Sequence, residues 1–321
     1  MAGLLFFSAL LGVTQGALNI DLMAELSTLE LAIITDIRLP RVLMTMVTGS
    51  GLAVCGLILQ CLCRNPLADP GIIGVSWGAA LFAAVAILIS GSVAIPAEIG
   101  LVFIPLMAFL GAAIALALLL TIAGYKQSVN NLVLILTGVA INAGALTLLG
   151  FVSYLADDET LRVITFWQLG SYGGISWQEA ILATAIVSLS FAIFIRLSNQ
   201  IMLMQISEQH AHFQGVPVAK VKRLLLVLVA LVTAVCVCFT GLVNFVGLVV
   251  PHICRMIVGA NLKVLLPASA LSGAVLVTLA DMFSRIIIVP AELPIGLLTS
   301  ALGVPFFLWL ILREKRKFAY D

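Results

Sequence analysis

The chain has 321 residues, of which 62% are hydrophobic and only 10% are charged, and its formal net charge at pH 7 is +1. Soluble domains average roughly 45–50% apolar and about 25% charged residues. The composition therefore excludes a soluble globular domain, a disordered chain and a nucleic-acid binder with a basic face, and it predicts an all-α protein that crosses a membrane several times.

Hydropathy indicates where the helices cross the membrane. A helix needs about 20 apolar residues to span the hydrocarbon core. In chain order, nine stretches are plainly or nearly long and apolar enough to predict a spanning helix: 40–62, 72–91, 99–124, 128–152, 178–197, 221–241, 243–258, 265–289 and 294–312. The stretch 243–258 is short and contains Pro251, so we expect a broken or partly buried helix there.

The first stretch, from Met1 to about Leu18, is apolar but short. We interpret it as a short first span, which gives about ten spans in total. The alternative is a cleaved signal peptide, although the stretch lacks the basic start that is typical of one. The prediction is a single membrane domain over residues 1–321. Its longer connecting loops are 19–39, 153–177 and 197–220.

The distribution of basic residues predicts the orientation. With the C-terminus inside, twelve of the 16 Lys and Arg residues lie on the inner side, as the positive-inside rule requires. The loop 197–220 then faces the inside, and the loops 19–39 and 153–177 face the outside. The four basic residues on the outer side are Arg38, Arg41, Arg162 and Arg285.

Motifs of covalent chemistry are scarce. The sequence has no G-x-x-x-x-G-K-[ST] phosphate-binding loop and no H-E-x-x-H metal motif. The six cysteines lie in or beside apolar stretches without metal-site spacing, and we interpret them as packing residues. We therefore predict no catalytic residue, no metal site and no bound cofactor. Because the spans also carry few ionisable groups, we expect the energy for any transport to come from elsewhere.

Three segments carry longer motifs. The first is Arg38-Leu39-Pro40-Arg41, followed after its span by Asn65-Pro66-Leu67-Ala68-Asp69-Pro70-Gly71, which predicts a tight inner turn. The second and third are Gly241-Leu242-Val243-Asn244-Phe245-Val246-Gly247-Leu248-Val249-Val250-Pro251-His252 and Ala291-Glu292-Leu293-Pro294-Ile295-Gly296-Leu297-Leu298-Thr299-Ser300. In this order the motifs resemble the FecCD-type permeases of ATP-binding-cassette importers for iron–siderophore complexes, haem and cobalamin. The resemblance covers residues 36–312.

The resemblance implies a fold like that of the cobalamin importer permease, a type II ABC importer. It also implies a homodimer in the bacterial inner membrane, two cytoplasmic ATPase subunits that use ATP and Mg, and one periplasmic binding protein. Haem is the expected cargo, with a ferric siderophore or cobalamin as alternatives, because few fixed charges suit a large and partly apolar ligand. From the residues alone, an ion-coupled secondary transporter and a membrane-embedded enzyme remain the alternatives of other classes.

The same resemblance implies roles for the outer arginines. Arg38, Arg41 and Arg285 match positions that receive acidic residues of the binding protein, and arginine offers a planar fork for a carboxylate. The alternatives are interfacial snorkelling of Arg38 and Arg41 and a structural pair between Asp281 and Arg285, which are four residues apart.

By resemblance, the translocation path lies on a dimer axis and is lined by the spans 128–152 and 294–312. Asn130, Asn131 and Asn142 are candidates for its inner gate, with ordinary interhelical hydrogen bonding as the alternative. Met44 and Met46 are candidates for sulfur contact with a haem, with packing as the alternative.

The inner loop contains the predicted coupling element. Residues 207–214 can form a short helix that Gly215 and Pro217 end. By resemblance this helix enters a cleft on the ATPase subunit. The residues assigned to this coupling are Glu208, His210, Ala211, His212, Phe213, Gln214 and Gly215.

Overall fold

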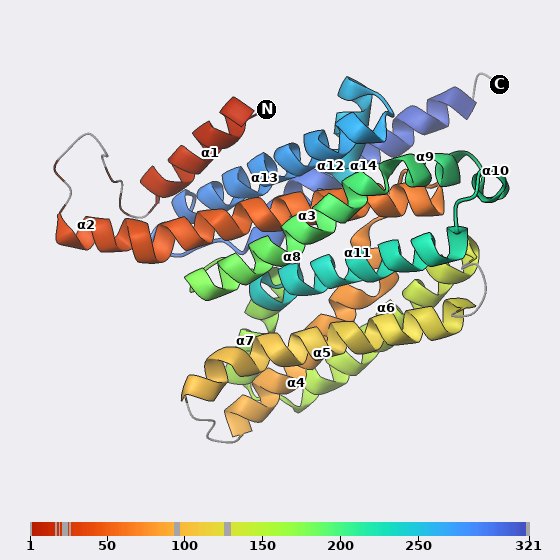
Figure 1. Ribbon diagram of the computed structural model, residues 1–321. Helices are drawn as coiled ribbons and strands as arrows, with labels where there is room; N and C mark the ends of the chain where they lie inside the picture. The colour runs from red at the N-terminus through yellow and green to blue at the C-terminus, as the bar shows by residue number, and fades with distance from the viewer. Residues whose placement is uncertain are drawn as a thin grey trace.

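The structure is a computed structural model, and it describes residues 2–16, 18, 20, 25, 27–92, 97–124 and 130–318. These residues form helices and no strands, which confirms the all-α prediction. Figure 1 shows the long helices packed side by side, with α2 at one end of the bundle and α9, α10 and the C-terminal end of α14 at the other. The helices of 13 or more residues are α1 (Ala2–Thr14), α3 (Leu39–Cys63), α4 (Val75–Ser92), α5 (Ala97–Gly124), α6 (Asn131–Leu155), α8 (Trp177–Arg196), α11 (Val218–Thr240), α12 (Val246–Val258), α13 (Leu262–Ile286) and α14 (Ile295–Phe318).

Shorter helices join the long ones. They are α2 (Thr28–Ala32), the π-helical η1 (Ile33–Arg38), the 3-10 helical η2 (Pro70–Ile73), α7 (Asp158–Leu169), α9 (Ser198–Ile206) and α10 (Glu208–Phe213). Helices α2, η1 and α3 follow one another without a break, so this part of the chain is helical from Thr28 to Cys63.

Each predicted stretch contains one helix. Six helical regions are long and apolar enough to cross a membrane: Thr28–Cys63, Val102–Gly124, Asn131–Leu155, Trp177–Arg196, Val218–Thr240 and Leu262–Ile286. The other apolar helices are shorter: Gly3–Thr14, Val75–Gly91, Val246–Val258 and Ile295–Leu310. The chain is therefore a multi-pass membrane protein, and the total of ten spans stays a prediction.

Helix α3 is the central element of the bundle. In its apolar part 83% of the residues are buried, against 28% in α6 and in α8. Glycines allow its close contacts: a Cβ on Gly49 would overlap the backbone of Gly273 in α13, and a Cβ on Gly56 would overlap the backbone of Gly247 in α12. No hydrophobic driving force holds helices together within lipid, so membrane helices gain dispersion energy by bringing their backbones this close.

The segment 64–74, which joins α3 to α4, folds back into the bundle. Arg64 ends α3 in a left-handed conformation, and Asp69 accepts the backbone N–H of Gly71 at 2.8 Å. The side chain of Asn142 in α6 donates to the carbonyl of Gly71 at 2.8 Å. Asn142 lies eleven residues into α6, or about 17 Å along the helix, which is about half of a ~30 Å hydrocarbon core. We call residues 64–74 the re-entrant segment.

The depth of the re-entrant segment corrects the predicted tight inner turn. The turn chemistry at Asn65 and Asp69 is present, but the turn lies inside the protein, because η2 packs against Gly138 of α6 and Pro70 packs against Gly247 of α12. Non-helical backbone is tolerated at this depth only where protein surrounds it. Helices α4 and α12 therefore both begin inside the bundle, beside the re-entrant segment.

The two long loops are partly helical. The predicted outer loop 153–177 contains α7, which begins where Asp157 accepts the backbone N–H of Thr160 at 2.9 Å. The hydrogen bonds that Asp157 accepts from Thr160 lower the pKa of its side chain, because they stabilise the ionised carboxylate. The predicted inner loop 197–220 contains α9 and α10.

Candidate docking, gate and coupling sites

The structure brings the three predicted docking arginines together where α3 begins and α13 ends, at the predicted outer side. Arg41 donates from Nη2 to Asp281 at 2.8 Å, and it donates from Nη1 and Nη2 to the two carboxylate oxygens of Glu292 at 2.9 Å each. Arg285 pairs with the same Asp281, with 3.2 Å between Nε and Oδ2. The predicted structural pair of Asp281 and Arg285 is therefore confirmed.

Arg38 and Arg285 hold the end of the first helix. Arg38 donates to the carbonyls of Val13 and Thr14 at 2.7 and 2.9 Å, and Arg285 donates to that of Gly12 at 2.8 Å. The last carbonyls of a helix lack intrahelical partners and carry partial negative charge, so guanidinium groups stabilise them. We call Arg38, Arg41, Asp281, Arg285 and Glu292 the outer arginine cluster.

The burial of the outer arginine cluster changes how docking is understood. Each of its three arginines is only 6% exposed and is bound by the chain's own carboxylates or carbonyls. The free guanidinium forks that the resemblance implies are therefore absent from the described structure, and the role in docking stays a prediction. Glu292 is the accessible member, with 43% of its side chain exposed. Sequence reasoning missed Glu292 as a partner of Arg41, because 251 residues separate the two.

The three predicted path asparagines occupy different environments. Asn130 is exposed and caps α6 by accepting the backbone N–H of Leu132 at 2.9 Å. Asn131 donates to the carbonyl of Leu62 at the end of α3 at 2.9 Å, and Asn142 holds the re-entrant segment. Asn131 and Asn142 thus make the interhelical hydrogen bonds of the alternative interpretation, and a role in the path stays a prediction.

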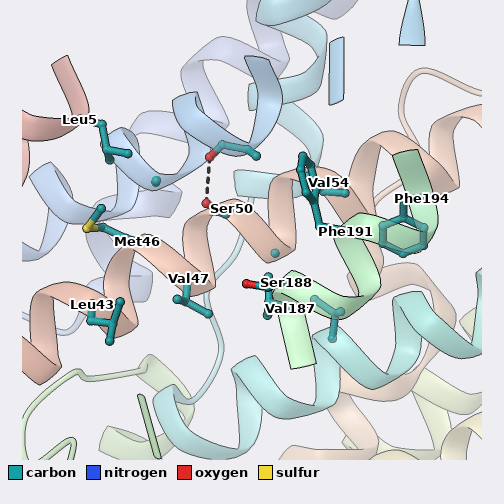
Figure 2. Close-up of a pocket in the computed structure, with 14 residues that line it drawn as sticks. Leu5, Leu43, Met46, Val47, Ser50, Val54, Val187, Ser188, Phe191 and Phe194 are labelled. Carbon is teal, nitrogen blue, oxygen red and sulfur yellow. Dashed lines mark hydrogen bonds between the residues drawn. The ribbon is translucent and has the colours of Figure 1, made fainter. Parts of the chain in front are cut away.

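The two methionines also differ. Met44 is fully buried between helices of this chain, as the packing interpretation expects, and contact with a cargo stays a prediction. Met46 lines an apolar cavity of about 320 Å³ together with residues such as Leu5 and Phe191 (Figure 2). The polar side chain of Ser50 in this cavity already donates to the carbonyl of Ala270 at 3.0 Å, as the dashed line in Figure 2 shows. The lining belongs to α1, α3, α8, α11 and α13 and not to the predicted path helices α6 and α14.

The predicted coupling helix is present as α10. Ser207 accepts the backbone N–H of His210 at 3.3 Å to begin the helix, and Gly215, with φ +82°, follows its end. The side chain of Phe213 is 85% exposed. Of the other assigned residues, His210, His212, Gln214 and Gly215 are exposed, Glu208 is half-buried and Ala211 is buried. The helix is confirmed, and its contact with an ATPase stays a prediction.

Lys222 links the coupling helix to the predicted gate. It belongs to α11, its side chain is 2% exposed, and its Nζ donates to Glu208 of α10 at 2.9 Å and to Asn131 of α6 at 2.6 Å. Sequence reasoning assigned Lys222 only to the inner cations. The helical phase of α11 offers a signal, because Lys222 shares a face with the buried Val218 and Leu225, whereas Lys220 is exposed.

The alternative of a membrane-embedded enzyme has one pattern in its favour. Residues 74–78 read Gly-Val-Ser-Trp-Gly and match the G-x-S-x-G of serine hydrolases. In the structure Ser76 faces a recess of about 20 Å³, and none of the chain's three histidines lines it. A nucleophilic serine needs a base within hydrogen-bond reach, so the pattern does not form a catalytic site here. The glycines serve packing instead, since a Cβ on Gly78 would lie 2.7 Å from the carbonyl oxygen of Gly111 in α5.

Comparison with known proteins decides the family. The profile of the FecCD transport family matches residues 2–313. The chain belongs to the FecCD transport family. This membership confirms the resemblance seen in the three motifs and makes the chain the permease of an ABC importer. Permeases of this family are transport subunits without catalytic activity of their own, and a partner subunit hydrolyses ATP.

The curated relatives of this FecCD permease carry different cargoes. The hemin transport system permease protein HmuU of Yersinia pestis is 40% identical over 282 residues, which cover 88% of this chain and 84% of HmuU. The vitamin B12 import system permease protein BtuC of Vibrio cholerae is 34% identical over 319 residues, covering 98% and 93%. A solved inward-facing structure of a metal-chelate type ABC transporter has a TM-score of 0.87 at 31% identity and covers 97% of each chain.

Proposed function

We propose that this FecCD permease carries haem from the periplasm to the cytoplasm across the bacterial inner membrane. The observation that supports haem is the 40% identity with the hemin permease, against 34% with the vitamin B12 permease of Vibrio cholerae and 38% with the cobalamin permease of Halobacterium salinarum. In this proposal the chain binds no cofactor and no metal of its own. Two ATPase subunits on the inner side use ATP and Mg, and a periplasmic binding protein delivers the cargo. Cobalamin or a ferric siderophore is the alternative cargo.

The proposed unit is a homodimer with the C-terminus in the cytoplasm. Apolar side chains stand exposed along the predicted path helices, including Leu132, Leu136 and Leu146 of α6 and Leu302 and Leu308 of α14. A second copy facing these helices would enclose a path whose walls carry few fixed charges. Such walls suit a large, mostly apolar ligand better than a small ion.

Docking of the binding protein is proposed at the outer arginine cluster. A carboxylate of the binding protein would replace Glu292 on Arg41, because Glu292 is the accessible acceptor and its two bonds to Arg41 are the ones nearest to solvent. The exchange conserves two charge-assisted hydrogen bonds, so its net free energy depends on the remaining contacts of the interface.

Docking of the ATPase is proposed at α10. Phe213 is a large apolar side chain in the inner loop and is 85% exposed, which is costly in water and favourable in a partner's cleft. An adjoining groove of about 540 Å³ is lined by Glu208, His212 and residues 217–220. Together they offer the ATPase one apolar anchor with polar groups around it.

The proposal is tested with the permease, its ATPase and its binding protein reconstituted in liposomes. We expect accumulation of haemin that requires ATP, is blocked by vanadate and is insensitive to a protonophore. Cyanocobalamin and a ferric hydroxamate are offered in parallel. Accumulation of either compound instead of haemin would reassign the cargo, whereas accumulation without ATPase subunits would refute the importer mechanism and favour a secondary transporter.

A further inference from the structure

Lys222 is a buried cation at the meeting point of three helices. Its ammonium group lies within 2.9 Å of Glu208 on the coupling helix α10 and within 2.6 Å of Asn131, the first residue of α6. Both contacts are side chain to side chain, so neither is needed to complete the backbone of a helix. The arrangement joins α10 to α6 through this lysine's side chain.

The contacts continue from Lys222 into a closed ring. Asn131 donates to the carbonyl of Leu62 at the end of α3, at 2.9 Å. Two residues further on, Arg64 donates to the carbonyl of Met204 in α9, also at 2.9 Å. Helix α9 leads directly into α10 and back to Glu208. The inner ends of α3, α6, α9, α10 and α11 are therefore held in one polar network.

Packing alone does not explain a lysine at this position. The neighbours of Lys222 on its face of α11 are apolar, and an apolar side chain would fill the site without the desolvation of an ammonium group. A buried charge of this kind fixes which groups lie opposite each other, since its partners cannot move away without leaving it uncompensated. It thus resists any separation of α10 from α6.

The turn after α10 makes such a link necessary. Gly215 has φ +82°, a left-handed conformation that favours glycine, and α10 has only six residues. A short helix beside a glycine can pivot on that residue, so a force applied to α10 would be lost in the turn before it reached α11. The contact between Glu208 and Lys222 bypasses the turn and transmits the displacement by side chains.

We propose that Lys222 is the positioning residue that couples movement of α10 to the inner end of α6. This inference rests on the proposed function, in which α10 receives the ATPase and α6 lines the path. When the ATPase moves α10, Glu208 shifts Lys222, and Lys222 shifts Asn131 together with the start of α6. The chemistry of the link is one ammonium group shared by a carboxylate and an amide.

The test measures coupling in the complete complex in liposomes. The readout is haemin accumulated per ATP hydrolysed. Cyanocobalamin or the ferric hydroxamate replaces haemin if that is the compound the wild-type vesicles accumulate. We expect Lys222→Met to lower this ratio at least tenfold while ATP hydrolysis stays within twofold of wild type, and Lys222→Arg to restore part of the ratio. The matched control is Lys263→Met, which removes an exposed lysine charge at the start of α13, outside the proposed ATPase groove, and leaves the ratio unchanged.

A second measurement separates transmission from mere stability and serves even if Lys222→Met assembles poorly. Glu208→Ala and Asn131→Ala alter different helices, and both side chains bind the same Nζ. We expect the double variant to lower the ratio no further than the worse single variant. The inference would be overturned if the double variant lowered the ratio by the product of the two single-variant losses. It would also be overturned if Lys222→Met left the ratio unchanged. A wild-type complex that accumulates none of haemin, cyanocobalamin and the ferric hydroxamate with ATP would instead refute the proposed function.

Discussion

Asp281 is predicted to be the residue on which the outer arginine cluster depends for stability. Its side chain is 2% exposed and accepts from Arg41 at 2.8 Å while pairing with Arg285 at 3.2 Å. The change Asp281→Asn keeps the shape and removes the charge that two buried guanidinium groups share. Removing one partner of a buried ion pair costs about 3–5 kcal/mol. Because asparagine retains one acceptor oxygen, we expect a loss near the lower end, about 3 kcal/mol.

The expected loss converts to a measurable shift in melting temperature. With an unfolding entropy of about 2.1 cal/mol/K per residue, a chain of 321 residues has about 0.7 kcal/mol/K, so a loss of about 3 kcal/mol lowers Tm by about 4–5 °C. The assay is thermal unfolding of the purified permease in detergent, followed by size-exclusion chromatography. The matched control is Asp36→Asn, an exposed acid on the same side, with an expected change of under about 0.5 kcal/mol.

A double variant tests the reason for the loss. Arg41→Met removes one of the two guanidinium groups that Asp281 compensates, so in the Asp281→Asn background it should cost about 1–3 kcal/mol less than in the wild type. Equal costs in the two backgrounds, or an Asp281→Asn protein that melts with the wild type, would contradict the view that Asp281 holds these charges together.

Three further predictions follow from the described geometry. Glu292→Gln weakens the acceptor that already binds Arg41, so the binding protein's carboxylate has about 1 kcal/mol less competition. Docking of the binding protein should tighten about 3–10-fold, measured by surface plasmon resonance on permease in nanodiscs. An unchanged affinity would exclude the carboxylate exchange. Phe213→Ala should lower the affinity of the permease for the ATPase about 30-fold or more, because an aromatic anchor contributes about 2 kcal/mol. The Tm of the permease should not change. Co-purification of the ATPase at wild-type yield under dilution would argue against this anchor. The pKa of Asp157 is lowered in the folded state, so its carboxylate caps α7 fully above the unfolded pKa and loses the cap as pH falls through the folded pKa. Amide hydrogen exchange in the first turn of α7 should become faster in that acid range. Asp157→Asn should remove this pH dependence.

The sequence predicts the helices well because lipid leaves the backbone no other choice. Each apolar stretch must satisfy its own N–H and C=O groups, so hydropathy alone locates the helix of nearly every predicted stretch. The depth of the re-entrant segment was not predictable in the same way. Its turn residues indicate a turn, but its position inside the bundle depends on contacts with Asn142 and Gly138, which lie about 70 residues further along the chain.

The candidate sites show the same division. The helix at 207–214 and the family motifs could be found from local patterns, because caps and turn residues act over a few positions. The partners of Arg41 and Lys222 could not, because their contacts join residues up to 251 positions apart and no spacing rule covers such pairs. The burial of Met44 was not predictable for the same reason, since a residue's hydrophobic character does not say which face of a helix packs against its neighbours.

The grip of Arg285 on Gly12 also has a consequence for biosynthesis. The two residues are 273 positions apart, so a ribosome that adds about 5–20 residues per second needs roughly 15–55 seconds to reach the arginine after the glycine. During that interval the first helix can be held by Arg38 but lacks Arg285, the second of its two anchors. Nascent chains that stop before residue 285 should therefore hold this helix less firmly than the complete chain does. The N-terminal part of the protein gains its last contact, from Arg285 to Gly12, only when synthesis is almost finished.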